Sequence, residues 1–165
     1  MTLFLILFIL SLVVAGVHVY RDKRRRTGGR IAEIFLLWLL VINTGLGGIW
    51  AFVGHTVFAG QVAESIGWPA GNPFQTEVAV ANLAIGTLGI LCYWSRGGFW
   101  TATVIATSIW LLGGAAIHLL EIATASNYNP GNAGLIFYLD IVSPVVLIVL
   151  LVYYNLTGQA RARTR

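Results

Sequence analysis

Long apolar stretches separated by short polar or charged segments give this chain of 165 residues its pattern. Five of these stretches approach or exceed the roughly 20 residues with which a helix crosses a hydrocarbon core about 30 Å thick. Backbone N–H and C=O groups cannot stay unpaired in lipid, so stretches of this kind are expected to be helical. The pattern therefore predicts an all-α fold, a polytopic membrane helix bundle with five transmembrane helices. These cover approximately residues 2–20, 32–54, 76–94, 99–121 and 135–154.

The composition agrees with this prediction and argues against an ordinary soluble domain. Apolar residues make up 58% of the chain and charged residues only 10%, with a mean hydropathy of +0.82. About a quarter of the residues of a soluble domain are charged. The length suits one compact unit, so residues 1–165 are expected to form a single transmembrane domain.

The positions of the basic residues predict the orientation of the chain. A net charge of +4 would suit nucleic acid binding, but all ten Lys and Arg residues lie in the segment 21–30, at Arg96 or in the segment 161–165. Five helices place these three segments on one side of the membrane, and cytoplasmic loops collect Lys and Arg. We therefore expect a multi-pass protein of the cell membrane, with its N-terminus outside, its C-terminus in the cytoplasm and no nucleic acid partner.

The first apolar stretch differs from a cleaved signal peptide. No basic residue precedes it, and "RDKRRR" at 21–26 follows where a small-residue cleavage site would stand. It is expected to remain in the protein as the first helix.

The segment "GHTVFAGQVAESIGWPAGNPFQTEV" at 54–78 mixes polar and apolar residues and is predicted to be the first outer loop. Within it Phe58, Val62 and Ile66 recur at four-residue intervals, which predicts a short helix lying in the membrane interface. The Gly, Pro and Asn residues that follow are expected to turn the chain back. The second outer loop, 123–134, is also rich in ordinary turn residues.

The acidic residues divide between the two sides. Asp22 and Glu33 lie next to the basic segments, where pairing is expected. The other four are on the predicted outer side, which holds no Lys or Arg of this chain. A buried carboxylate there must be protonated, paired, metal-bound or hydrated, because leaving it bare costs several kcal/mol. Glu64 is expected to be hydrated, whereas Asp140 lies within the fifth helix, where ionisable groups usually face a bundle interior or a water-filled cavity.

Two histidines reach the same outer side, and together with three of the carboxylates they form the candidate site. We predict that these five side chains line one outward-facing polar pocket for an ion, a proton or a small solute. They are His55, Glu77, His118, Glu121 and Asp140.

His118 and Glu121 are the expected centre of this pocket. With Gly114 they are spaced by four and three residues, so all three share one helix face, and the glycine lets another helix approach. Helical metal sites use two Glu-x-x-His motifs, but only one such motif is present here, in reversed order. No cofactor is therefore predicted. A divalent metal at His118 and Glu121 is one alternative, and hydrogen bonding of the two to each other or to neighbouring helices is the other.

Pro144 stands four residues after Asp140 in the fifth helix. A proline there removes the hydrogen bond to the Asp140 carbonyl and tends to kink the helix. The spacing predicts a bend or a widening of the helix between these two residues.

Small residues predict where helices pack closely. One stripe of the third helix is typical of a helix-packing seam and comprises Ala79, Asn82, Gly86, Gly89 and Tyr93. A matching set is expected to serve the second helix in the same way, namely Asn43, Thr44, Gly45, Gly47 and Gly48.

Several segments resemble a family of small prokaryotic integral membrane proteins known only as a domain of unknown function. They are "GH" at 54–55, "IGWPAGNPFQTEVAVANLAIG" at 66–86, "HLLEI" at 118–122 and "NPGNAG" at 129–134. The resemblance covers roughly residues 45–150 and leaves out the first helix and its basic loop. It implies a membrane bundle and transfers no activity.

Two functions from different classes agree with these observations. One is a protein whose outward-facing polar site takes an ion, a proton or a small solute; the other is a structural or accessory membrane subunit without its own ligand. An enzyme is less well supported, because no Ser/His/Asp order, phosphate loop or paired metal motif is present. The expected partners are the lipid bilayer and either a second copy of the chain or another membrane protein.

Overall fold

The computed structural model describes residues 2–24 and 26–163. Within this part of the chain all regular structure is helical, and five helical rods are long and apolar enough to cross a membrane. The predicted all-α fold and its five spans are therefore confirmed. The elements are α1 (Thr2–Arg21), α2 (Gly28–Trp38), the π-helix η1 (Leu39–Leu46), α3 (Gly47–Thr56), α4 (Ala59–Ile66), α5 (Pro73–Leu91), α6 (Gly98–Ala125) and α7 (Leu135–Arg163).

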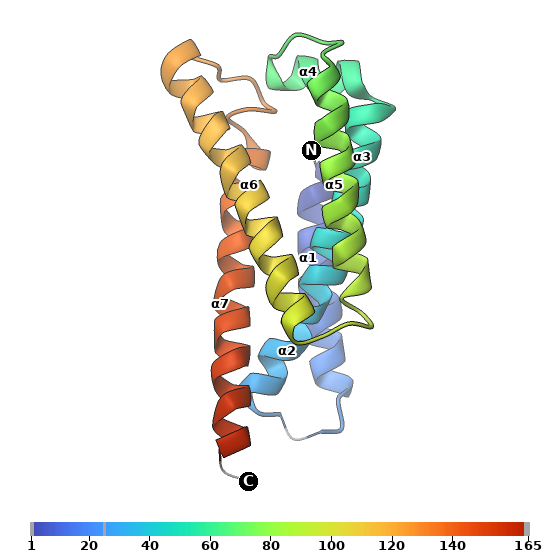
Figure 1. The fold of residues 1–165 in the computed structure, drawn as a ribbon, viewed down its shortest axis with the longest axis vertical. Helices are drawn as coiled ribbons and strands as arrows, with labels where there is room; N and C mark the ends of the chain where they lie inside the picture. The colour runs from blue at the N-terminus through green and yellow to red at the C-terminus, as the bar shows by residue number, and fades with distance from the viewer. Residues whose placement is uncertain (1, 25, 164–165) are drawn as a thin grey trace.

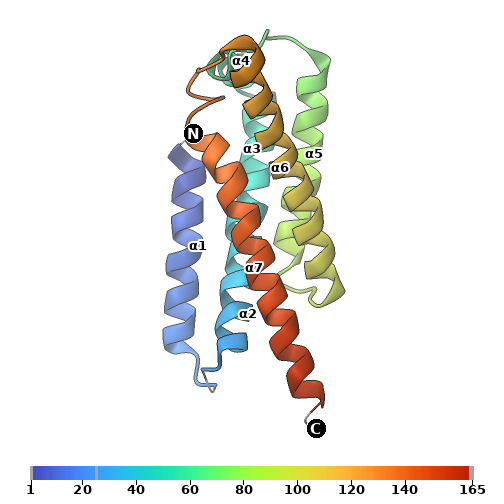
Figure 2. The same cartoon turned by 90° about the vertical axis from the view of Figure 1, so that its left-hand side faces the viewer.

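The segments α2, η1 and α3 form one continuous rod at the centre of the bundle. This rod contacts α1, α5 and α7, and α6 packs against α7 (Figures 1 and 2). The short helix α4 lies at the end of the bundle where α3 ends and α5 begins (Figure 1). The presence of α4 confirms the short helix predicted from the spacing of Phe58, Val62 and Ile66. Its place in the membrane interface stays a prediction.

Local sequence signals set several helix ends. The side chain of Thr27 accepts a hydrogen bond from the Arg30 N–H and caps the start of α2. Asn72 caps α5 in the same way, and Pro73 occupies the first turn, where its missing N–H costs nothing. At the end of α4, Gly67 takes the left-handed conformation with φ +86°, which glycine adopts without strain.

A close helix contact joins the central rod to α5 through four glycines. A Cβ added at Gly89 would lie 2.6 Å from the Gly45 backbone nitrogen, and one added at Gly48 would lie 2.7 Å from the Gly86 backbone. The predicted seam is confirmed. The sequence did not predict that Gly45 lies in a π-helical segment, a form that usually occurs as a short bulge within α-helices.

The apolar core lies toward the end of the bundle that carries the basic segments. Trp100 is fully buried there against Leu147 and Leu151, and its indole N–H donates to the Cys92 carbonyl at 2.9 Å. The whole cluster comprises Leu36, Leu37, Leu39, Leu40, Cys92, Trp100, Val104, Leu147 and Leu151. It fills the bundle between α2, η1, α6 and α7 at that end.

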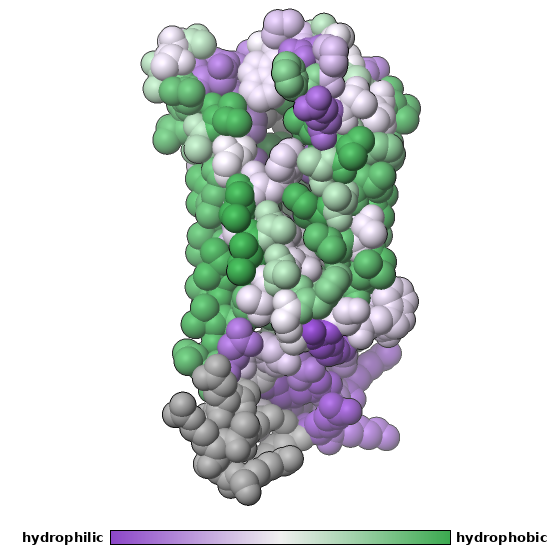
Figure 3. All heavy atoms as spheres, viewed as in Figure 1, coloured by the Kyte–Doolittle hydropathy of each residue, from purple (hydrophilic) through white to green (hydrophobic). Residues whose placement is uncertain are grey.

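Ion pairs tie the helices together at the basic end. Arg30 lies 2.7 Å from the Asp22 carboxylate and 2.8 Å from that of Glu33, and Arg96 lies 3.3 Å from Glu33. The pairing predicted for both carboxylates is confirmed. Figure 3 shows a hydrophobic belt between hydrophilic ends, the pattern of a bundle that sits in a bilayer.

Candidate functional site

His118 is held near the end of α6 that lies opposite the basic segments. Its side chain is buried, and its Nδ1 lies 2.7 Å from Oδ1 of Asn132 in the loop between α6 and α7. The amide nitrogen of Asn132 donates to the carbonyls of His118 and Asn127, at 3.2 and 2.8 Å. Carbonyls only accept hydrogen bonds, so this amide group has one possible orientation, with Oδ1 as the acceptor. His118 must therefore carry its hydrogen on Nδ1, and only Nε2 is left to exchange a proton.

The free nitrogen of His118 faces Asp140 on α7. The distance from His118 Nε2 to Asp140 Oδ2 is 3.8 Å, and the two side chains are only 10% and 17% exposed. This separation is that of an ion pair and is too long for a direct hydrogen bond. Gly114 makes room for the carboxylate, because a Cβ at this position would lie 3.3 Å from Asp140 Oδ2. The sequence placed both groups at this end but did not predict that they face each other.

Trp68 connects Glu121 to His118. The indole ring stacks on the imidazole with 6.3 Å between ring centroids and 17° between planes. Its N–H lies 3.4 Å from the Glu121 carboxylate, which also receives the Asn127 amide at 3.4 Å. In the described residues no hydrogen bond joins Glu121 directly to His118. The carboxylate is therefore the outer member of a network whose inner members are His118, which is buried, and Asp140, which is partly buried.

The loop between α6 and α7 is fastened to α4 and covers this network. The N–H of Gly131 donates to the Ser65 carbonyl at 2.8 Å, and the Asn127 side chain donates to the Ile66 carbonyl at 2.9 Å. The composition of this loop predicted only a turn, so the roles of Asn127 and Asn132 were not predicted. Their side chains act on residues of other elements, which turn composition alone does not reveal.

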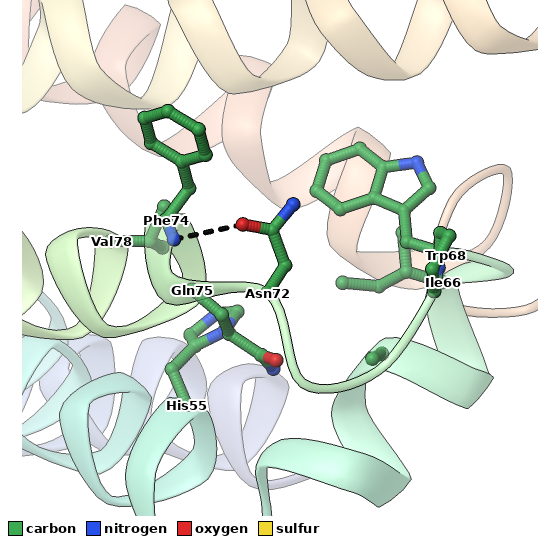
Figure 4. Close-up of a pocket in the computed structure, with 9 residues that line it drawn as sticks. His55, Ile66, Trp68, Asn72, Phe74, Gln75 and Val78 are labelled. Carbon is green, nitrogen blue, oxygen red and sulfur yellow. Dashed lines mark hydrogen bonds between the residues drawn. The ribbon is translucent and has the colours of Figure 1, made fainter.

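His55 lies at a different part of the same end. Its Nδ1 is 3.5 Å from the Gln75 side-chain nitrogen, which also donates to the Ala59 carbonyl at 2.8 Å. His55 and Gln75 border a cavity of about 200 Å³, and Trp68 lies on the opposite wall (Figure 4). Trp68 thus borders this cavity and also stacks on His118.

Glu77 is exposed on α5 and makes no hydrogen bond or ion pair within the described part of the chain. The structure therefore joins His118, Glu121 and Asp140 into one network and sets His55 at a neighbouring cavity. Nothing described links Glu77 to either group. That all five residues share one pocket stays a prediction.

α7 continues through Pro144 as an α-helix, and the proline is fully buried. Because proline has no N–H, the Asp140 carbonyl lacks the usual helical donor four residues later. The expected bend of the helix stays a prediction.

Donor atoms for a metal ion are few at this end. Across residues 2–24 and 26–163, no three His, Cys, Asp or Glu side chains come together as a metal-binding group. His118 faces Asp140, so a cation shared with His118 would take Asp140 as its second donor and leave Glu121 bound to Trp68. A divalent metal at His118 and Glu121 stays one of the two alternatives for this site.

The comparisons with known proteins give one match. The model of a family of unknown function, DUF6790, matches residues 1–160. No curated protein and no solved structure matches the chain. The match extends beyond the region 45–150 expected from the motifs and includes the first helix and its basic loop.

Proposed function

The chain belongs to the family of unknown function DUF6790, and we propose that it is a membrane protein that takes up and releases a proton at the pair His118 and Asp140. One observation carries the proposal: His118 Nε2 lies 3.8 Å from Asp140 Oδ2 inside the bundle, away from the end that holds the Lys and Arg residues. An isolated buried charge is costly. A single proton, carried by either the imidazole or the carboxyl group, leaves the pair neutral overall and removes that cost.

The geometry of the pair limits its protonation states. Since Nδ1 donates to Asn132, only His118 Nε2 and the Asp140 carboxyl group can exchange protons. With one proton between them, the pair is neutral overall, either as two uncharged groups or as imidazolium and carboxylate. Burial disfavours the uptake of a second proton, because the pair would then carry a net positive charge. It equally disfavours the loss of the one proton, because the pair would then carry a net negative charge. Proton exchange would therefore be coupled to a compensating event, such as the entry of water or a cation.

A cation that binds between the two groups would displace the shared proton. His118 Nε2 and Asp140 Oδ2 would be its donors, and imidazole nitrogen and carboxylate oxygen are both common ligands for divalent metals. Since a divalent ion that replaces the one proton leaves a net charge of +1, a hydroxide or another anion would have to enter with the metal. This exchange is the second form of the proposal.

Access to the pair is expected from one side only. Between the pair and the basic end lies the apolar core around Trp100 and Leu147, whereas the opposite end is covered by Trp68 and the α6–α7 loop. Under the positive-inside rule that opposite end faces outward. The pair would then exchange protons with the outer solution.

The chain contains only two aspartates, Asp22 and Asp140, which permits a direct test. Protein labelled with carbon-13 at the aspartate carboxyl groups would be placed in nanodiscs and followed by NMR as a function of pH. Asp22→Asn identifies the signal of Asp140. We expect the Asp140 signal to titrate and its midpoint to move in His118→Asn, whereas the matched variant His55→Asn leaves it in place.

Two outcomes would contradict the proposal. One is an Asp140 signal that does not respond to pH; the other is a midpoint that is the same in wild type and His118→Asn. The accessory-subunit hypothesis would then take its place, with a second copy or another membrane protein as the partner. A matching titration with divalent metal ions separates the proton from the cation form.

A further inference from the structure

Two adjoining hollows lie beside His55 and share three polar side chains. The inner one, of about 200 Å³, has apolar walls that include Trp68, Phe74 and Val78 (Figure 4). The outer one, of about 510 Å³, opens past Thr56 and Thr76. His55, Asn72 and Gln75 line both. A polar boundary thus separates an apolar inner space from a more open entrance.

The size and charge of these hollows restrict what they can hold. An engineered apolar cavity of about 150 Å³ binds benzene, so the inner hollow has room for one ring with a small substituent. Among the described residues that line either hollow there is no Asp, Glu, Lys or Arg. A charged ligand would lose its hydration there without gaining an opposite charge. The geometry therefore favours a neutral molecule.

Within the polar boundary, Asn72 and Gln75 together offer one donor group and one acceptor group. Asn72 uses its Oδ1 to cap α5, and Gln75 uses its Nε2 on the Ala59 carbonyl. In the described part of the chain, Asn72 Nδ2 and Gln75 Oε1 make no hydrogen bond. A hydroxyl group both donates and accepts one hydrogen bond, so it can pair with either atom.

We propose that these hollows bind a small neutral alcohol or phenol, with its ring in the inner hollow between Trp68 and Phe74 and its hydroxyl group between Asn72 and Gln75. This site is separate from the proton pair and does not depend on it. The two share the indole of Trp68, which walls the inner hollow and stacks on His118.

The probe is 4-fluorobenzyl alcohol, followed by fluorine NMR with the protein in nanodiscs and with empty nanodiscs as the reference for partitioning into lipid. Val78→Phe fills the inner hollow. Val80→Phe is its matched control, because Val80 lies on the same helix, is 57% exposed and lines neither hollow. We expect saturable binding to wild type and Val80→Phe, and at least tenfold weaker binding to Val78→Phe.

A second variant tests the hydroxyl position without changing the volume. Gln75→Leu should weaken binding about fivefold, the effect of one lost hydrogen bond, while Gln61→Leu on the exposed face of α4 should not. Asp140→Asn should bind the probe as wild type does, which separates this site from the proposed proton pair. The proposal fails if the protein shows no saturable binding above empty nanodiscs. It also fails if a folded Val78→Phe variant, checked by its helical circular dichroism, binds as well as wild type.

Discussion

Trp68 stacks on His118 with 6.3 Å between ring centroids, and this contact joins the α4 end of the bundle to the buried pair on α6 and α7. The indole covers the imidazole and at the same time donates its N–H toward Glu121. It is 38% exposed, so it stands between the solvent and His118. Trp68, a residue of the first outer loop, is thus the cover of the candidate site.

Removal of this cover should expose His118. In Trp68→Ala we expect faster deuterium exchange at the His118 ring carbon, measured by mass spectrometry, and a loss of about 1–3 kcal/mol of stability, less than for a fully buried tryptophan. Trp68→Phe keeps the stacking and should lose only about 1 kcal/mol for the hydrogen bond. His18, which bonds Trp38 at the far end, is the internal reference. Unchanged exchange at His118 in Trp68→Ala would show that the indole does not shield it.

Asn132 should be among the most sensitive polar positions in the protein. It is fully buried and makes three hydrogen bonds, to the His118 ring, the His118 carbonyl and the Asn127 carbonyl. Asn132→Leu leaves these partners unsatisfied and should cost about 2–5 kcal/mol. Asn155→Leu, at an exposed position on α7, is the control and should cost less than about 0.5 kcal/mol. Unfolding in detergent by circular dichroism gives both values, and equal losses would refute the role assigned to Asn132.

The sequence predicted the parts of this structure that depend on local pattern. The five long helices follow from apolar length, α4 from the spacing of Phe58, Val62 and Ile66, and the seam from Gly86 and Gly89. It did not predict η1, because a π-helix depends on how the central rod packs against α5. It placed Asp140 and His118 at one end without predicting their contact. The reason is that helix periodicity fixes the face of one helix but not its rotation against another.

The glycine seam allows a test of packing that is independent of the polar site. A Cβ at Gly89 would meet the Gly45 backbone at 2.6 Å, and backbone atoms cannot move aside as a flexible side chain can. Gly89→Ala should therefore cost about 3 kcal/mol or more. Gly113→Ala, where a Cβ meets nothing within 4 Å, should be neutral or add up to about 1 kcal/mol through helix propensity. Thermal unfolding of the two variants decides this, and a tolerated alanine at position 89 would contradict the close approach.

Stability at the basic end should fall in acid because of Asp22. Its pKa lies below the ordinary value, first because its carboxylate accepts the Arg24 backbone N–H and then because it bonds to Arg30. A carboxyl group with a lowered folded-state pKa stabilises the protein above its unfolded-state pKa of about 3.9 and loses that contribution as the pH falls through the folded value. The difference in Tm between wild type and Asp22→Asn should therefore shrink as the pH is lowered from 6 to 3. A constant difference would contradict the ion pair.

The orientation of the bundle can be tested by cysteine labelling, because the native thiol is expected to contribute little to the labelling. Cys92 is fully buried, so it should react slowly with a maleimide at neutral pH. Ala70→Cys in the α4–α5 loop and Lys23→Cys in the basic loop are both exposed and lie at opposite ends of the bundle. The positive-inside rule predicts that an impermeant maleimide labels position 70 in intact cells and reaches position 23 only after permeabilisation. The reverse result would mean that the protein has the opposite orientation in the membrane. The pair His118 and Asp140 would then exchange protons with the cytoplasm.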